Sequence, residues 1–363
     1  MKKIRFSIIQ QLSILKNKEN KNKETSLQDI AKKLGVSVTL VSLVLNGKAK
    51  RSRISDKVAD KVVALAKELN YRPNQLARGL RTGKTNTLAF VMADISNIFF
   101  ARMARVMEDE AEKHGYKVMF GSSDESPVKL EKMLNIFLER KVEGFIISPT
   151  QGSLDFIKHL KRMNIPFVLI DRFFRKLETN YVTVDNYDAS FKAVSHLTDF
   201  GYPKIGTLSI FPELTQMNDR FKGYKDALRA AGLRFENNYV GQVDFDNFRE
   251  SVFENVKRLL MPPNNVRALF FPTCIMGIVG LECIREMKFR VPLDVAVASF
   301  DDPAEYKLFE TPVTAIKQPV EEIGLTAVNI LIDELKNKNQ AYQKVVLPTE
   351  FIVRRSCGNL EFS

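Results

Sequence analysis

The sequence predicts a small all-α helix-turn-helix domain followed by a larger α/β body made of two similar lobes. Three observations carry this prediction. All of the surplus positive charge lies in residues 1–86. Within that region, two short amphipathic segments are separated by a three-residue turn that begins at Gly35. From Thr87 onward, short apolar runs alternate with amphipathic segments, and this rhythm occurs twice.

The length and composition are those of a globular protein with more than one domain. The chain has 363 residues, of which 45% are hydrophobic and 27% charged, enough for a small domain and one or two full-sized ones. Its apolar runs are shorter than the roughly 18 residues that span a bilayer, so we expect a cytoplasmic protein without a membrane partner. Cys274, Cys283 and Cys357 lack Cys-x-x-Cys spacing, which favours reduced thiols and no zinc site.

The uneven charge is the first indication of a polyanionic partner. Residues 1–86 contain 20 Lys and Arg against 6 Asp and Glu, whereas the rest of the chain contains 35 against 37. Such a concentration of positive charge is typical of a nucleic-acid-binding surface. A solubilising tail is the alternative interpretation. It fits residues 1–24, which have no apolar periodicity, and we expect a disordered basic extension there.

Two short helices are predicted between Ser26 and Leu45. Ser26 is placed to cap the first helix, and Gly35 ends it. The apolar face of this helix consists of Leu27, Ile30, Ala31 and Leu34. The second helix starts at Ser37 and has the apolar face Leu40, Val41, Val44 and Leu45. So short a turn predicts a crossed pair that places its second helix in a DNA major groove. A plain helical hairpin is the alternative for this stretch taken by itself.

A third amphipathic helix is predicted after a cap at Ser55. Its apolar positions are Val58, Val62, Leu65, Ala66 and Leu69. This helix completes the core of a DNA-binding headpiece that we place at residues 25–73. The loop before it brings four cations beside the presumed groove, namely Lys48, Lys50, Arg51 and Arg53. Cations in such a loop contact phosphates, which adds affinity and salt dependence without sequence information.

This region resembles the headpiece of the LacI/GalR family of bacterial transcription regulators. The matching motifs, in the family's order, are Leu27-Gln-Asp-Ile-Ala, Gly35-Val-Ser, Val41-Ser-Leu-Val-Leu-Asn46, Ile54-Ser and Leu69-Asn-Tyr-Arg-Pro-Asn-Gln-Leu-Ala-Arg78. The resemblance implies that Val38 and Thr39 face base edges of a double-stranded operator. It also implies that phosphates are bound by Ser37, Ser42 and Asn46.

One position departs from the family pattern. Leu43 stands where an arginine that reads a guanine is normally found, so the bidentate hydrogen bond to guanine is lost. Leu43 and Val38 are apolar and suit contact with thymine methyl groups instead. We therefore expect an operator with a shifted base preference.

Residues 74–86 form the predicted connection between the headpiece and the body. The resemblance implies a hinge helix that orders on the operator, with Asn74, Ala77 and Leu80 at the DNA and Leu80 wedged between base steps. A plain linker is the alternative, because so short a helix is unstable in isolation. The stretch 79–85 resembles a phosphate-binding loop, but it is one residue short between its glycines and follows no strand.

The body is predicted to hold two parallel sheets. The first set of strands is predicted at 87–92, 116–120, 144–148 and 166–170, with helices near 99–114, 128–140 and 154–163. The second set follows at 204–208, 239–243, 268–271 and 295–300. Two doubly wound sheets of this kind leave a cleft at the carboxyl ends of their strands, where small molecules usually bind.

The body also resembles, over roughly residues 86–356, the periplasmic-binding-protein-like (type I) effector domain of the same family. The matching motifs are Asp94-Ile-Ser-Asn-Ile-Phe-Phe100, Ile170-Asp-Arg172, Val184-Asp-Asn186, Gly201-Tyr, Asp219-Arg-Phe-Lys-Gly-Tyr224, Phe300-Asp-Asp302 and Lys317-Gln-Pro319. We place this effector-binding and dimerisation domain at 87–357, with a tail at 358–363. Lobe 1 is predicted over about 87–186 and 316–343, and lobe 2 over about 187–315 and 344–357.

The resemblance implies that Arg220, Asp301 and Asp185 reach a small-molecule effector. The rigid guanidinium of Arg220 suits vicinal hydroxyls or a carboxylate, and the two aspartates accept hydrogen bonds from hydroxyl groups. A second group of candidates consists of aromatic rings that can stack on an apolar ligand face, namely Phe99, Phe100 and Phe245. For these rings the hydrophobic core is an equal alternative.

Two further positions are weaker candidates for effector binding. Arg172 fits a salt bridge at the rim of the cleft equally well. Thr273 stands, with Cys274, where the family often has Asn-Asp, so one usual contact to a ligand hydroxyl is absent. The expected effector is a sugar or a sugar derivative, but this departure leaves its identity open even among sugars.

An enzyme is the other class to weigh, and the sequence does not favour it. It contains no Gly-x-Ser-x-Gly elbow and no His-Glu-x-x-His motif. The three histidines, His114, His159 and His196, have no partner at metal-ligand spacing. Asp301 and Asp302 are adjacent, and adjacent side chains generally point apart. We therefore expect no catalytic residue, no bound metal and no cofactor.

The sequence thus predicts a DNA-binding transcription regulator controlled by a small molecule. One recognition helix covers only a half-site, so we expect a homodimer on a pseudo-palindromic operator. We expect a repressor released by its effector, although a corepressor would act through the same linkage with the opposite sign. The alternative is a sugar-binding protein without a transcriptional role, which is the natural interpretation of the body alone.

Overall fold

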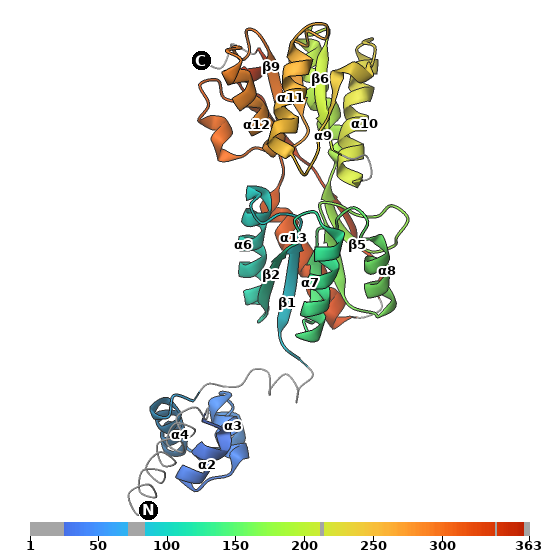
Figure 1. Cartoon of the computed structure of the whole chain (residues 1–363). Coiled ribbons are helices and arrows are strands. Elements are labelled where there is room, and N and C mark those ends of the chain that lie inside the picture. The colour runs from blue at the N-terminus through green and yellow to red at the C-terminus, as the bar shows by residue number, and fades with distance from the viewer. Residues whose placement is uncertain (1–24, 72–83, 211–213, 338–339, 359–363) are drawn as a thin grey trace, which may run out of the picture. The chain divides into compact units, whose positions relative to one another are not determined.

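The computed structural model describes residues 25–71, 84–210, 214–337 and 340–358. The chain divides into two compact units, Met1–Gly83 and Lys84–Ser363, and each is described by itself (Figure 1). The predicted extension at 1–24 lies outside the described residues, as do Asn74, Ala77 and Leu80 of the predicted hinge. What we expect of these segments stays a prediction.

The described part of the first unit is all-helical. Its elements are α2 (Leu27–Leu34), α3 (Val38–Leu45), the short 3-10 turn η1 (Lys50–Ser52) and α4 (Asp56–Glu68). Ser26 begins α2 in a capping box: its hydroxyl accepts the Asp29 N–H, and the Asp29 carboxylate accepts the Ser26 N–H at 2.8 Å. The Ser37 hydroxyl likewise accepts the Leu40 N–H at 3.2 Å and begins α3. These caps fix where the two helices start.

A glycine turn and a small apolar core hold the three helices together. Gly35 has a φ of 67°, a left-handed conformation that costs glycine little, so α2 ends there and the chain turns directly into α3. The core residues are Ile30, Ala31, Val41, Val44, Val62 and Ala66. Each helix contributes two of them, so the first unit has the crossed-helix arrangement that the periodicity predicts.

Lobe 1 of the second unit is an α/β sandwich around a six-stranded parallel sheet in the order β11-β5-β4-β3-β1-β2. Its strands are β1 (Thr87–Met92), β2 (Lys117–Ser122), β3 (Gly144–Ile147), β4 (Phe167–Ile170), β5 (Asn180–Val184) and β11 (Lys344–Leu347). Its helices are α6 (Ile98–Lys113), α7 (Pro127–Glu139), α8 (Leu154–Arg162) and α13 (Val320–Lys336). Side chains of α6 and α13 pack on one face of the sheet, and those of α7 and α8 on the other.

Lobe 2 repeats the plan with a second six-stranded sheet in the order β12-β10-β9-β8-β6-β7. Its strands are β6 (Ile205–Ser209), β7 (Val240–Gln242), β8 (Ala268–Phe271), β9 (Ala296–Phe300), β10 (Thr314–Lys317) and β12 (Glu350–Ile352). Its helices are α9 (Asn186–Asp199), α10 (Thr215–Ala230), α11 (Phe248–Leu260) and α12 (Cys274–Glu286). Short 3-10 turns complete it: η2 (Asn237–Tyr239), η3 (Ala304–Lys307) and η4 (Arg355–Cys357).

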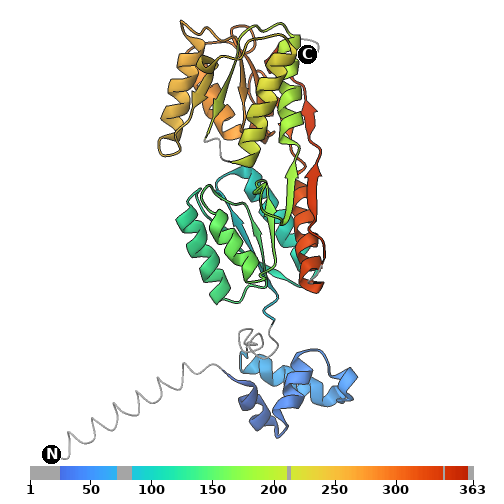
Figure 2. The same cartoon turned by 90° about the vertical axis from the view of Figure 1, so that its right-hand side faces the viewer.

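The structure corrects the predicted lobe boundaries. We expected 344–357 in lobe 2, but β11 pairs in parallel with β5 and belongs to lobe 1. We expected lobe 1 to resume at 316, but β10 pairs with β9 in lobe 2. The chain therefore crosses between the lobes after β5, after β10 and after β11, and the connecting segments lie side by side in Figure 2. One strand also departs from the predicted parallel order, because β12 is antiparallel to β10.

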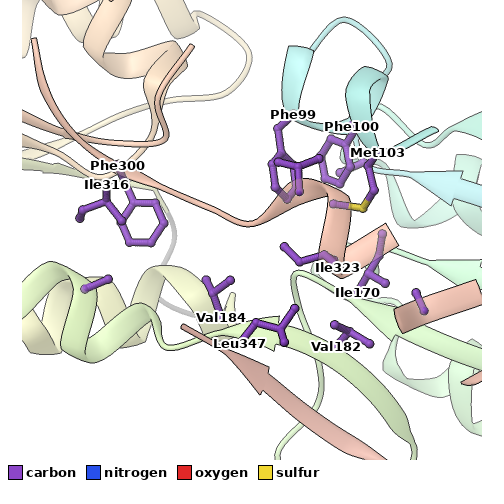
Figure 3. Close-up of a cluster of buried hydrophobic side chains, with 14 of the residues drawn as sticks. Phe99, Phe100, Met103, Ile170, Val182, Val184, Phe300, Ile316, Ile323 and Leu347 are labelled. Carbon is purple, nitrogen blue, oxygen red and sulfur yellow. The ribbon is translucent and has the colours of Figure 1, made fainter. Parts of the chain in front are cut away.

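A single apolar core continues through both lobes. Phe99, Phe100 and Met103 of α6 lie in the same cluster of buried side chains as Phe300 and Ile316 of lobe 2 (Figure 3). Because close-packed interiors transmit displacement, this cluster couples the two lobes mechanically. Among the helices of the described ranges, none combines the length and the apolar character that crossing a membrane requires.

Candidate functional site

Helix α3 presents the side chains that the sequence predicts to read DNA. Its buried residues, Val41 and Val44, face the small core, which turns the opposite side outward. Val38 is 41% exposed and Thr39 is exposed, both in the first turn. Leu43 is half-buried, so its side chain is partly available to a base edge. An apolar and a hydroxyl-bearing residue at the start of an exposed helix suit contacts to thymine methyls and base edges.

Ser42 and Asn46 are bonded to each other in this structure. The Asn46 side-chain amide donates to the Ser42 carbonyl oxygen at 2.6 Å and lies 3.3 Å from the Ser42 hydroxyl. The pair therefore forms one polar patch at the C-terminal end of α3. The Asn46 backbone N–H also donates to the Ser42 carbonyl, so this patch is held in place by the end of the helix.

The predicted basic loop is confined to a short, exposed turn. Lys48, Lys50, Arg51 and Arg53 are all exposed, and none forms an ion pair with an acidic residue in the described ranges. Arg53 has a φ of 57°, which lets the loop reverse direction before α4. Four such cations on one loop form a surface that attracts phosphates electrostatically.

A second candidate site is a cavity of about 90 Å³ between lobes 1 and 2. It lies at the carboxyl ends of strands from both sheets, where doubly wound folds bind ligands. Seven of the eight residues predicted for effector binding line it: Phe99, Phe100, Arg172, Arg220, Phe245, Thr273 and Asp301. The structure thus brings together residues that are up to about 200 positions apart in the sequence.

Arg220 is buried, and hydrogen bonds and a ring contact hold its side chain in place. It is 3% exposed; its Nε donates to the Asn186 side-chain oxygen at 2.8 Å and its Nη1 to the Pro272 carbonyl at 2.7 Å. The guanidinium carbon lies 3.5 Å from the centre of the Phe300 ring. Burial lowers the pKa of Arg220, against the opposing effect of Asp301 and Asp171. These contacts hold a buried cation in one orientation at the cavity wall.

Two aspartates occupy equivalent positions in the two lobes. Asp171 directly follows β4 with a φ of 64°, and Asp301 directly follows β9 with a φ of 69°; both line the cavity. Gln318 donates to Asp301 Oδ1 at 2.6 Å, whereas Asp171 Oδ2 lies 3.3 Å from Nε of Arg172 in an ion pair. Burial raises the pKa of Asp171, although the nearby guanidinium groups of Arg172 and Arg220 act in the opposite direction.

Arg172 forms a buried ion pair rather than a rim salt bridge. It is 8% exposed, and its two terminal nitrogens donate to the two carboxylate oxygens of Glu125 at 2.6 Å each. Its Nε lies 3.3 Å from Asp171 Oδ2. The salt bridge of the alternative interpretation is therefore present, but it is buried, because lobe 1 encloses the guanidinium between two acidic groups, and Arg172 also lines the cavity.

Asp185 is the one predicted effector residue that does not line the cavity. It is exposed and caps α9 by accepting the Asp188 N–H at 2.9 Å. The inward position belongs to its neighbour Asn186, which is buried and holds Arg220. The prediction for Asp185 is corrected on geometric grounds, because a carboxylate committed to a helix start faces the helix backbone.

The remaining predicted residues have mixed environments. Phe99 and Phe100 are buried in the core that spans the lobes and also form part of the cavity wall. Each ring is therefore both a core residue and a residue of the cavity lining. Phe245 is 37% exposed at the cavity mouth. Thr273 caps α12, because its hydroxyl accepts the Met276 N–H at 3.3 Å, and one side of it faces the cavity.

Sequence reasoning missed several polar cavity residues, namely Asn97, Glu125, Asp171, Gln216 and Gln318. Gln216 is 4% exposed, and its side-chain oxygen has no hydrogen-bond partner among the described residues. Asp171 and Gln318 directly follow strands, which is a usable signal. Gln216 carries no such signal, because it begins a helix after a segment without regular periodicity. In the described ranges, no cluster of three His, Cys, Asp or Glu is arranged to hold a metal.

Known protein families match both units of this chain. Residues 26–74 match the family described as bacterial regulatory proteins, lacI family, and residues 194–357 match a periplasmic binding protein-like domain. The transcriptional regulator DegA of Bacillus subtilis (strain 168) is 29% identical over 93% of this chain and 99% of its own length. Catabolite control protein A of Priestia megaterium is 30% identical over 91% of this chain and 98% of its own length.

A solved structure shares the fold of the whole described chain. The lac repressor dimer bound to operator and the anti-inducer ONPF has a TM-score of 0.81 and 22% identity, over 92% of this chain and 99% of that one. The predicted fold class, a helix-turn-helix headpiece with a two-lobed periplasmic-binding-protein-like domain, is thereby confirmed. The two relatives named above carry the names of regulators and not of enzymes.

Proposed function

This chain belongs to the LacI family of bacterial regulatory proteins, and on that premise we propose that it is a cytoplasmic repressor whose affinity for its operator is adjusted by a sugar or sugar derivative. Members of this family bind DNA as regulators of transcription, with a small-molecule effector. The observation that carries the proposal is the cavity in which Arg220, Asp171 and Asp301 converge from the two lobes.

The size of the cavity supports a coupling between ligand and conformation. Its volume of about 90 Å³ is far below the roughly 300–1,000 Å³ of typical small-molecule pockets. A sugar therefore enters only if the lobes or the lining side chains move apart. A ligand that binds one arrangement of the lobes better than another shifts the protein toward that arrangement. In a two-fold dimer, that shift changes the spacing of the two headpieces and hence the affinity for a pseudo-palindromic operator.

Removing residues 1–83 tests whether the first unit binds the operator and the second unit binds the effector. We expect the remaining chain to retain effector binding and to lose operator binding by at least about a thousandfold, because specific binding exceeds non-specific binding by about that factor or more. Electrophoretic mobility shift or fluorescence anisotropy on genomic fragments measures the loss. Full operator affinity in the truncated chain would refute the proposal.

A screen of sugars and nucleobases by thermal shift tests the effector class. Each hit is compared between the wild type and Arg220→Ala, with each protein measured against its own ligand-free baseline because Arg220 also packs in the core. Arg229→Ala is the matched control, since Arg229 lies on the same helix as Arg220, forms an exposed ion pair with Asp226 and is not among the residues that line the cavity. Equal shifts in all three proteins would remove Arg220 from the binding site.

Leu43 provides a test of how the operator is read. We expect the wild type to select sites from random DNA without a strict guanine opposite residue 43, and Leu43→Arg to gain a guanine there, because a bidentate arginine–guanine contact contributes about 1–3 kcal/mol of discrimination. Lys32→Arg, an exposed cation on α2, is the control. Recovery of a guanine that depends strictly on Leu43 in the wild type would contradict the expected base preference.

A further inference from the structure

Lobe 1 contains another cavity, at the opposite end of its sheet from the cavity between the lobes. We call it the α8–α13 cavity, after the two helices that end at it. Its volume is about 430 Å³, within the roughly 300–1,000 Å³ of typical small-molecule pockets. Phe167 at the start of β4 and Asn180 at the start of β5 line it, whereas Asp171, which directly follows β4, lines the cavity between the lobes. The two cavities are therefore distinct.

The buried wall of the α8–α13 cavity carries a hydroxyl group without a partner. Thr179 belongs to the lining and is only 1% exposed. Its side-chain oxygen has no hydrogen-bond partner among the described residues. A buried hydroxyl of this kind is unfavourable until another molecule supplies a partner. Thr179 is therefore a polar contact that this cavity offers to a ligand.

Glu334 gives the same cavity a carboxylate without a cationic partner in the described ranges. It is half-buried on α13 and belongs to the lining. The Asn180 side-chain amide donates to its Oε2 at 2.8 Å, and the Asn180 side-chain oxygen accepts the Gln343 N–H at 2.8 Å. These bonds hold the carboxylate in one position. Burial raises the pKa of Glu334, so a cation beside it would stabilise its ionised form.

The one cation in the described lining, Lys161, has partners of its own. Its ammonium group donates to the Glu178 carbonyl oxygen and lies 4.7 Å from the centre of the Tyr342 ring. The other basic residues at these two helix ends, Arg162 and Lys336, are exposed outside the lining, where water and salt screen them. A helix C-terminus carries a partial charge of about −0.5. Because α8 and α13 both end here, the cavity favours a cation.

We propose that the α8–α13 cavity is a second ligand site, which takes a molecule with a primary ammonium group. Glu334 is the counter-ion of that group, and the Thr179 hydroxyl forms a further hydrogen bond to the ligand. An α-amino acid and a simple amine share this chemistry, and they differ in whether a carboxylate reaches Lys161. The inference does not depend on the proposed function, because the two cavities share no lining residue.

Three molecules of similar length test the charge of the ligand on the full chain. Cadaverine carries ammonium groups, 1,5-pentanediol is its uncharged analogue, and L-lysine adds a carboxylate. We expect cadaverine or L-lysine to bind with a Kd of about 1 mM or tighter. The diol should bind at least about tenfold more weakly, because charge-assisted hydrogen bonds are the stronger ones. Calorimetry measures each Kd, and the tighter of the two ammonium compounds identifies an amino acid or an amine as the ligand.

Substitutions in the lining test where that compound binds. Glu334→Gln keeps an acceptor for the Asn180 amide and removes the charge, so we expect at least about tenfold weaker binding. Asp333→Asn, at the exposed preceding position of α13, is the matched control and should bind as the wild type does. Thr179→Val should weaken binding about threefold or more without lowering the unfolding midpoint, because its hydroxyl has no hydrogen bond to lose among the described residues.

Three results would overturn the proposal. The first is the absence of saturable binding of both ammonium compounds by the wild type, or equal binding of the diol. The second is equal affinity of Glu334→Gln and the wild type, which would place the compound elsewhere in the protein. Lys338 follows Glu334 by four positions in the sequence and lies outside the described residues. Binding by Lys338→Gln but not by the wild type is the third result, because it would show that Lys338 already neutralises Glu334.

Discussion

Individual residues at the cavity are held by their backbone positions as much as by their partners. Asp171 and Asp301 both adopt left-handed φ values directly after a strand, which turns each carboxylate toward the space between the lobes. Their environments then differ, because Gln318 donates to Asp301 whereas Asp171 relies on the nearby guanidinium groups. Burial outweighs those groups and raises the pKa of Asp171. A raised pKa in a lined cavity is the pattern expected of a binding-site carboxylate.

Asp171→Asn should stabilise the effector-binding unit at neutral pH and lose that advantage in acid. The folded protein holds the Asp171 proton to higher pH than the unfolded chain does. Asp171 therefore makes its full contribution to the stability of the wild type below about pH 4. This contribution is lost as the pH rises through the raised pKa of Asp171. Asparagine keeps the left-handed backbone without titrating. Urea unfolding at about pH 4 and about pH 7 measures the difference in the free energy of unfolding.

Asp294→Asn serves as a control of opposite sign. Side-chain and backbone hydrogen bonds from Arg290 lower the pKa of Asp294 to about 2, so the folded state favours the ionised form. Its stabilising contribution is present above about pH 4 and is lost as the pH falls toward about 2. The Asp294→Asn variant should therefore become less stable than the wild type as the pH rises. Parallel curves for the two variants would contradict the assignment of Asp171.

The elements of lobe 2 are fixed by close backbone packing as well as by apolar side chains. Helices α9 and α10 approach so closely at Gly223 that a Cβ there would lie 2.4 Å from the Tyr187 carbonyl oxygen and 2.9 Å from the Phe191 nitrogen. Both are backbone atoms and cannot rotate away. The same pair of helices carries Asn186 and Arg220, so their spacing sets the geometry of the cavity wall.

Gly223→Ala should destabilise the effector-binding unit by about 2 kcal/mol or more. Replacing glycine by alanine inside a helix usually raises the free energy of unfolding by about 1 kcal/mol. We expect a decrease here, because the added methyl group overlaps backbone atoms. Lys222→Ala, an exposed position on the same helix, should change stability by no more than about 0.5 kcal/mol. Chemical denaturation measures both changes, and a stabilised Gly223→Ala would show that the helices separate freely.

The basic loop before α4 should act on affinity and not on sequence preference. Replacing Lys48, Lys50, Arg51 and Arg53 by alanine removes four cations. The slope of log affinity against log salt should therefore fall by up to about 0.9 for each phosphate that the loop no longer neutralises. Specific and non-specific DNA should weaken alike. Anisotropy titrations over a range of salt concentrations give the slope. An altered base preference with an unchanged slope would show instead that this loop contacts the bases.

At the scale of the whole molecule, the chain consists of two compact units with separate cores. Among the residues 25–71 that the structure describes, the first has a small core of six buried residues. In the second, a continuous core joins lobes that the chain connects three times. Small cores confer little stability, so the units should not melt as one body.

Calorimetry of the full chain should resolve two unfolding transitions. An effector at about one hundred times its Kd should stabilise the second unit by about 2.7 kcal/mol and leave the headpiece transition in place, because the lining of the cavity belongs to the second unit alone. Removal of residues 1–83 should delete the smaller transition. A ligand-induced shift confined to the headpiece transition would contradict this assignment.

Local patterns in the sequence determined much of this protein. The three headpiece helices, their caps at Ser26 and Ser37, and the alternating elements of both lobes follow from side chains a few positions apart, because hydrophobic period, caps and glycine turns act over a few residues. Arg220 and Asp301 were placed at the cavity by the resemblance of their motifs to the family's effector domain, and both line it. Asp185 was misplaced because it and Asn186 are neighbours, and only the packing of α9 decides which one faces inward.

Only the tertiary structure decided which distant groups meet. Glu125 and Arg172 are 47 positions apart, and β11 joins β5 across more than half of the body; nothing in either local sequence indicates its partner. Such pairings depend on how twisted sheets and helices pack against one another, and a short apolar strand such as β11 fits either lobe by composition. The set of residues that line the cavity, and hence the chemistry of the ligand it accepts, is a property of that packing.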